Sequence, residues 1–201
     1  MNISISALFL SSRRIEMDIF AAIDLETTGL DFERCEVIEL AIVPLNPDFT
    51  VSAIPEFTAH IKAEHPETAE ADALRINGLN PQDGESKAKV RDDIIQWMKD
   101  NGIGRITPVA QNLEFDMRFF ARTFPDLSKI FGRYGRDSMR LALAVNDIFR
   151  RETGEDRFPK VSLQALKNAL NIDGDVQHNA FEDAKDAAAV YRRLTEMLTQ
   201  S

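Results

Sequence analysis

The sequence FAAIDLETTGL, residues 20–30, places two carboxylates in an otherwise apolar run. Residues 19–25 read as a buried β-strand, in which side chains two positions apart point to the same face. Asp24 and Glu26 would therefore lie side by side, with their Cα atoms roughly 6.5–7 Å apart. Because burying two unpaired carboxylates is costly, the stretch predicts a positive partner that the sequence itself does not supply.

The composition is typical of one α/β domain with at most a small appendage. Of 201 residues, 44% are hydrophobic and 28% are charged, which allows a sizeable core and a solvated surface. The single cysteine, Cys35, excludes an internal disulfide and predicts a small buried side chain. No run reaches the roughly 18 apolar residues that a membrane span needs, so no membrane association is expected.

The first 17 residues predict an N-terminal extension. Their basic pair, Arg13 and Arg14, follows a short apolar patch, whereas a secretory signal carries its charge first. We therefore expect residues 1–17 to be disordered or weakly paired, residues 18–201 to form a single domain, and the protein to be cytoplasmic.

The net charge of −9 is unfavourable for a protein that grips long nucleic acids through their phosphates. Basic residues are dense from Arg133 to Lys160. By default this stretch predicts a solvated helical face.

The apolar pattern predicts the order of the elements. After the first strand comes a turn with Gly29 at positive φ, and two further strands follow in an antiparallel meander. A helix then begins after the N-cap Ser86 and stops near Gly102. The further strands are expected at residues 36–45, 56–62 and 106–110, the other helices at 113–124, 138–151, 162–170 and 180–198, and loops at 64–85 and 151–161.

Three segments carry acids that could share one cleft. Asp24 and Glu26 end the first strand, Asp116 lies on the helix within QNLEFDMRFF, and Asp183 opens the last helix. His178 precedes Asp183 in HNAFEDAKDAAAVY. In open α/β sheets, functional groups gather where strand ends meet helix starts. We therefore expect four carboxylates and one imidazole to converge.

The three motifs together resemble those of the DEDDh 3′→5′ exonucleases, which include the epsilon proofreading subunits of DNA polymerases and ribonuclease T. They are DLETTG from Asp24, NLEFD ending at Asp116, and HNAFED from His178 to Asp183. The resemblance extends over roughly residues 18–198. It implies a ribonuclease H-like α/β fold, with a mixed five-stranded sheet flanked by helices, as a single exonuclease domain.

Two positions depart from the family pattern. Gln111 stands where a histidine is usual before the asparagine of the second motif, and Asn77 stands where a histidine is usual before Gly78. Neither position belongs to the expected metal-binding acids, so both affect the expected substrate contacts and not the chemistry.

The resemblance implies two divalent cations, Mg²⁺ or Mn²⁺, about 3.5–4 Å apart. Asp24 would bridge both ions, Glu26 and Asp183 would complete one shell, and Asp116 would hold the other ion largely through water. His178 would act as the general base that deprotonates the attacking water.

The resemblance also implies residues that bind the 3′ end of a single-stranded nucleic acid. Thr27, Thr28 and Leu30 would meet the terminal nucleotide, and Asn112 and Phe115 the penultimate one. For Phe115, a place in the core is an equally good interpretation.

The implied activity is release of nucleoside 5′-monophosphates, with DNA favoured. Trimming of RNA 3′ ends and a catalytically silent binding subunit remain alternatives, and a DNA polymerase subunit remains a further partner. The sequence does not determine the oligomeric state.

Other titratable residues have simpler interpretations. His60 and His65 are expected to be ordinary surface histidines. Asp137 is expected to cap the helix that follows it, and Asp186 is a weaker candidate for metal binding than Asp183.

Overall fold

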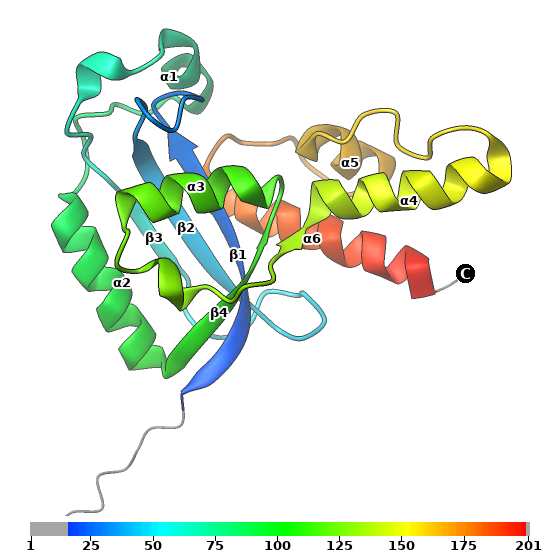
Figure 1. Ribbon diagram of the computed structural model, residues 1–201, viewed down its shortest axis with the longest axis horizontal. Helices are drawn as coiled ribbons and strands as arrows, with labels where there is room; N and C mark the ends of the chain where they lie inside the picture. The colour runs from blue at the N-terminus through cyan, green and yellow to red at the C-terminus, as the bar shows by residue number, and fades with distance from the viewer. Residues whose placement is uncertain (1–15, 200–201) are drawn as a thin grey trace, which may run out of the picture.

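The computed structural model describes residues 16–199 and shows a mixed five-stranded sheet with helices on both faces (Figure 1). The antiparallel pairing of β1 with β2 and of β2 with β3 confirms the predicted meander. β4 pairs in parallel with β1 and with β5. Across the sheet the strands lie in the order β3-β2-β1-β4-β5. Along the chain they are β1 (Met17–Thr27), β2 (Val37–Leu45), β3 (Phe57–His60), β4 (Ile103–Ala110) and β5 (Arg136–Asp137).

The helices of the described chain cover both faces of this sheet, and none of them is both long and apolar enough to cross a membrane. Two short 3-10 helices lie at Pro66–Thr68 and Ser128–Ile130. The α-helices are α1 (Ala71–Asn77), α2 (Lys87–Asn101), α3 (Leu113–Thr123), α4 (Ser138–Thr153), α5 (Leu163–Ala169) and α6 (Ala180–Thr199).

The ends of α2 and the start of α4 lie where the sequence predicted them. The Ser86 side chain accepts a hydrogen bond from the backbone N–H of Lys89, and Gly102 ends α2 in the left-handed region at φ 65°. Asp137 caps α4 by accepting the N–H of Arg140 at 3.1 Å. These signals are local in sequence, which explains why they could be read without the fold.

Besides the two 3-10 helices, α1 and β5 were not predicted from the residue pattern. α1 lies within the predicted loop at 64–85, and it buries no residue, so no apolar stripe marks it. β5 has only two residues and depends on pairing with Val109 and Ala110 of β4.

The first strand is longer than predicted because β1 has a partner on each side. Met17, which the sequence placed in the extension, is its first residue and donates its N–H to the carbonyl of Gly102 at 2.8 Å. Residues 1–15 of the predicted extension lie outside the described residues.

Side chains along β1 alternate between two cores. Ala21 and Ile23 belong to the core that α2 and α3 cover, whereas Ala22 packs with Ala184 and Ala188 of α6. Figure 1 shows α3 and α6 on opposite sides of the sheet. Because this alternation continues along the strand, Asp24 and Glu26, which lie two and four residues after Ala22, face the side of α6.

Candidate active site

Asp24 and Glu26 lie at the carboxyl end of β1, on the face that α6 covers. Glu26 pairs directly with Glu39 of β2, and the register shifts immediately after it, at Thr27. Both predicted acids are partly buried. The strand therefore presents its two carboxylates to the start of α6, as the alternation of β1 requires.

Asp183 and His178 come to these acids from the start of α6. Asp183 lies in the first turn, is 5% exposed, and accepts the backbone N–H of Gln177 at 3.1 Å. His178 lies in the preceding loop with φ 50°, a conformation that few non-glycine residues adopt. A ring nitrogen of His178 and carboxylate oxygens of Glu26 and Asp183 lie within 4.8 Å of one another.

Asp116 reaches the same place from the other face of the sheet. It lies in the first turn of α3 and is only 3% exposed. Its carboxylate is the charged group that acts most strongly on Asp24. The structure therefore brings together the four acids and the imidazole that the sequence singled out, at the carboxyl end of β1.

The carboxylates of this cluster repel one another. Burial raises the pKa of Asp24 well above its usual value, and the neighbouring negative charges, with Asp116 foremost, raise it further. Burial and the charges of Asp183 and Glu39 raise the pKa of Glu26 to about 7. Burial also raises the pKa values of Asp116 and Asp183. Carboxylate oxygens in such a cluster suit hard divalent cations, which would offset this repulsion.

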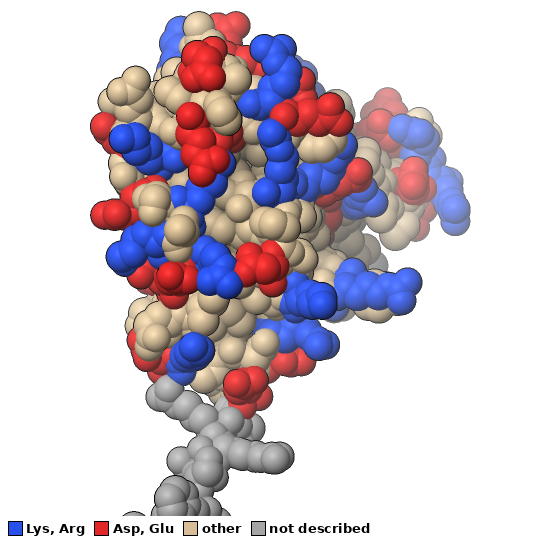
Figure 2. Space-filling model, turned by 60° about the vertical axis from the view of Figure 1, so that its left-hand side comes forward, with Lys and Arg blue, Asp and Glu red and all other residues tan. Residues whose placement is uncertain are grey.

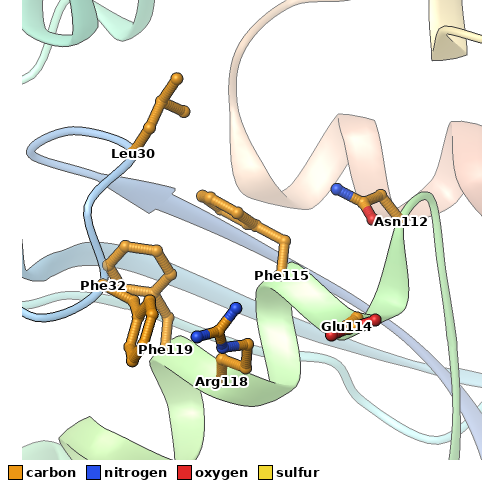
Figure 3. A pocket seen from close by; sticks show the side chains of 7 residues that line it. All are labelled: Leu30, Phe32, Asn112, Glu114, Phe115, Arg118 and Phe119. Carbon is orange, nitrogen blue, oxygen red and sulfur yellow. The ribbon is translucent and has the colours of Figure 1, made fainter.

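A cavity of about 180 Å³ is lined by the start of α3, the helix that carries Asp116, and by the loop that follows β1 (Figure 3). Phe115 lines it and also contacts Phe119 of the core, with ring centroids 4.8 Å apart. Its packing on the core is thus observed, and its contact with a nucleotide stays a prediction. Leu30 is 77% exposed at the rim. The lining residues are Leu30, Phe32, Asn112, Glu114, Phe115, Arg118 and Phe119.

Thr27 and Thr28 build the turn between β1 and β2. The Thr27 hydroxyl donates to the carbonyl of Gly29 at 2.7 Å, and the Thr28 hydroxyl oxygen accepts the N–H of Glu36 at 2.8 Å. The prediction that Gly29 has positive φ is wrong. A Cβ at this position would lie 2.5 Å from the end of the Glu70 side chain and 2.6 Å from the sulfur of Cys35, so these side chains would have to shift to admit one.

The two departures from the family pattern have different surroundings. Asn77 donates to the carbonyl of Thr27 at 3.1 Å, and its hydrogen bond with Glu26 opposes the rise in that residue's pKa. Gln111 donates to the carbonyl of Val161 at 2.7 Å and accepts the hydroxyl of Ser138. Asn77 therefore contacts the candidate site, whereas Gln111 joins the end of β4 to the segment before α5.

The remaining titratable candidates take part in other contacts. Asp186 forms an ion pair with the buried Lys167 of α5, which occupies its carboxylate. The ring nitrogen of His60 lies 3.6 Å from Glu39, and that of His65 lies 3.3 Å from Glu67. Both histidine side chains are largely exposed, as predicted.

Three residues near the site were not singled out from the sequence. Arg118 and Phe32 line the cavity, with the guanidinium carbon 3.6 Å from the centre of the ring. Glu39 is 6% exposed and lies beside Glu26 across the sheet. Arg118 and Phe32 carry no motif, and Glu39 lies in a strand whose residues are all buried, so only the fold identifies them.

A mixed five-stranded sheet flanked by helices, with a cluster of acids at the end of its central strand, has the architecture of the ribonuclease H-like class. The sequence matches the RNase_T exonuclease family over residues 21–191, and the chain belongs to that family. A comparison with curated proteins found no match.

Solved structures share the fold. Cell-death related nuclease 4 (CRN-4) superposes with a TM-score of 0.70 at 18% identity, over 92% of this chain and 66% of that one. E. coli exonuclease I in complex with a dT13 oligonucleotide has a TM-score of 0.68 at 20% identity, over 92% of this chain and 43% of that one. A zinc-bound form of the E. coli exonuclease I–single-stranded DNA complex gives 0.68 at 19% identity, over 92% and 43%. The chain thus spans less than half of the exonuclease I chain and just under two thirds of CRN-4.

Proposed function

We propose that this chain is a metal-dependent 3′→5′ exonuclease that acts on single-stranded nucleic acid, with DNA favoured, and releases nucleoside 5′-monophosphates. The convergence of acids from β1, α3 and α6 on one point carries the proposal. The resemblance of the three motifs to those of the DEDDh exonucleases supports the 3′→5′ direction. We assign the activity to a single domain, residues 18–201.

The acids fit a pair of divalent cations, Mg²⁺ or Mn²⁺. When bound, two such cations would activate water and neutralise charge on the attacking and leaving oxygens of the phosphodiester. We assign Glu26 and Asp183 to one ion, Asp116 to the other, and Asp24, which lies among all three, to both. The zinc-bound complex of exonuclease I supports a divalent cation in this fold.

We assign the general base to His178. Its side chain is exposed at the mouth of the cluster, and its ring lies within reach of Glu26 and Asp183. A water molecule held between these groups would pass its proton to a ring nitrogen as it attacks phosphorus. The carboxylates would be engaged as cation ligands, which leaves the imidazole to take that proton.

We assign the last nucleotides of the strand to the cavity in Figure 3. Leu30 and Phe115 offer apolar contacts that tolerate any base, and Asn112 offers a polar group. Arg118 supplies positive charge for a phosphate. The hydroxyls of Thr27 and Thr28 are engaged in the turn, and the backbone N–H and carbonyl of Thr28 bond Glu36 and Glu70. We therefore assign these two threonines to holding the turn that carries Leu30.

The proposed recognition of a strand end agrees with the charge of the protein. The net charge is −9, and Figure 2 shows acidic and basic side chains interspersed over one face. In the basic stretch, Arg140 contacts Glu114 at 2.7 Å, as expected for a solvated face. Cations at the acid cluster would attract the terminal phosphates without a broad basic surface. Exonuclease I, seen bound to dT13, supports a single-stranded substrate.

The test uses matched single-stranded DNA and RNA oligonucleotides labelled at the 5′ end. With Mg²⁺ or Mn²⁺, we expect labelled products that shorten one nucleotide at a time, and we expect a chelator to stop the reaction. Early release of labelled mononucleotide, or labelled fragments from internal cuts, would refute the 3′→5′ direction.

The same experiment decides between the alternatives. Faster turnover of the RNA strand would favour RNA 3′-end trimming over the DNA activity. Absence of turnover on both strands, together with absence of cation binding in a calorimetric titration, would indicate a silent binding subunit.

A further inference from the structure

Glu39 is a buried carboxylate that reaches from the sheet to the start of α6. It lies in β2 directly opposite Glu26 and is 6% exposed. One of its oxygens accepts the backbone N–H of Ala180, the first residue of α6, at 2.9 Å. The other accepts the side-chain amide of Asn179 at 3.3 Å. His60 is a further neighbour of Glu39, with its ring nitrogen 3.6 Å from the carboxylate.

These bonds hold the segment that carries two of the proposed catalytic groups. Asn179 follows His178, and its carbonyl accepts the N–H of Asp183 at 3.0 Å. Its side-chain oxygen accepts the N–H of Glu182 at 3.2 Å. Glu39 therefore anchors Asn179. This residue directly follows His178, and it accepts two N–H groups of the turn that contains Asp183.

The placement of Glu39 has an electrostatic cost. Its charge adds to the burial and the other acids that disfavour the ionised forms of Asp24 and Glu26. The Glu39 carboxylate also lies at the N-terminus of α6, where an anion is favourable because the unpaired N–H groups of the first turn attract it. The carboxylate thus offsets its repulsion of the acids by bonding the first turn of α6.

We propose that Glu39 is a positioning residue for the proposed nuclease: it fixes the start of α6 against β2, so that Asp183 and His178 face Glu26. This proposal rests on the proposed function for its effect on turnover, but its structural effect is independent of activity. Glu39 does not contact the cavity that we assign to the substrate, which separates its role from substrate binding.

The variants are Glu39→Ala, Glu39→Gln and, as a matched control, Glu36→Ala. Glu36 is also a buried carboxylate, 7% exposed, that accepts a backbone N–H, from His65 at 2.6 Å. Its second bond, to Lys87 at 2.6 Å, leads to α2 and away from α6. A general effect of losing a buried carboxylate should therefore appear in both alanine variants.

The first measurement is hydrogen–deuterium exchange of the metal-free proteins. Glu39→Ala should speed exchange at Ala180 and Asp183, whereas Glu36→Ala should leave these amides unchanged. The second is the affinity for Mn²⁺ by calorimetry, which Glu39→Ala should weaken about 10- to 100-fold, the usual range for a residue that orients a ligand. The third is kinetics, where kcat should fall and KM should stay near the wild-type value.

Glu39→Gln removes the charge and keeps one of the two bonds, because its amide oxygen still accepts the N–H of Ala180 whereas its NH2 group would face the NH2 group of Asn179. We expect this variant to recover part of the exchange protection, cation affinity and kcat that Glu39→Ala loses. Equal losses in Glu39→Gln and Glu39→Ala would overturn the proposal in favour of a purely electrostatic role. Unchanged exchange and affinity in Glu39→Ala would also overturn it. A wild-type protein that binds no Mn²⁺ and cleaves nothing would instead refute the proposed function, while the exchange data would still test the anchor.

Discussion

Asp116 of α3 is the charged residue that acts most strongly on Asp24 of β1, although α3 covers the face of the sheet opposite α6. The two carboxylates meet because the first turn of α3 lies at the end of β1. Asp183 reaches the same point from the first turn of α6. Helix starts on both faces of one strand end therefore concentrate negative charge where a cation would be bound, which leads to the following predictions.

The metal-free protein should be less stable at neutral than at mildly acidic pH. The folded state raises the pKa of Glu26 from 4.5 to about 7, so it binds a proton that the unfolded state has released. The free energy of unfolding should therefore fall as pH rises between these values, by roughly 1–3 kcal/mol. Thermal unfolding with a chelator at pH 5 and pH 8 measures this effect. Mn²⁺ should raise Tm more at pH 8, and an equal gain at both values would contradict a cation site among these acids.

Asp24→Asn should abolish turnover and stabilise the metal-free protein. The amide keeps the shape of the side chain but removes the charge that Asp116, Glu26 and Asp183 repel. We expect the rate to fall on the order of 10⁴-fold. We also expect a higher Tm at pH 8 in chelator, by roughly 2–4 °C for each kcal/mol gained. A variant that loses activity together with Tm would indicate misfolding rather than loss of a ligand.

His178→Ala should lower kcat by roughly 10²–10⁴-fold, because a general base is lost. The affinity for Mn²⁺ should stay nearly unchanged, since the four acids remain. In the wild type the rate should rise with pH as the base loses its proton, and this rise should be absent from the pH–rate profile of the variant. A profile with the same shape as the wild type would remove His178 from this role.

Phe115→Ala should raise KM for an oligonucleotide about tenfold, because one stacked base contributes roughly 1–3 kcal/mol. It should also lower Tm, since Phe115 contacts Phe119. Phe115→Leu separates these effects: it should restore Tm but not KM. Equal KM values in both variants and the wild type would assign Phe115 to the core alone.

Arg118→Ala should raise KM several-fold with little change in kcat, because the residue lines the cavity and is neither a proposed metal ligand nor the proposed base. The matched control is Arg91→Ala on α2, where an exposed arginine contacts Asp126. Steady-state kinetics at two salt concentrations measures both variants. An effect of the same size in Arg91→Ala would indicate a general effect of charge and not a contact in the cavity.

Patterns that are local in sequence predicted much of this protein. The apolar run before Asp24 marks β1, and Ser86 and Gly102 mark the ends of α2. The three motifs carry the proposed metal ligands and the proposed base because each needs specific residue types at short spacing. Strand alternation and helix capping act within a few residues, so the sequence by itself determined these features.

Only the tertiary structure decided which residues from separate segments meet. Glu39 belongs to an entirely buried strand, and nothing local shows that it bonds the start of α6. Arg118 becomes part of the cavity only because Phe32 folds against α3. α1 buries no residue and β5 has only two residues, so neither carries an apolar pattern of its own. The physical reason is common to all of these cases: their positions depend on cross-strand pairing and helix packing between residues far apart in the chain.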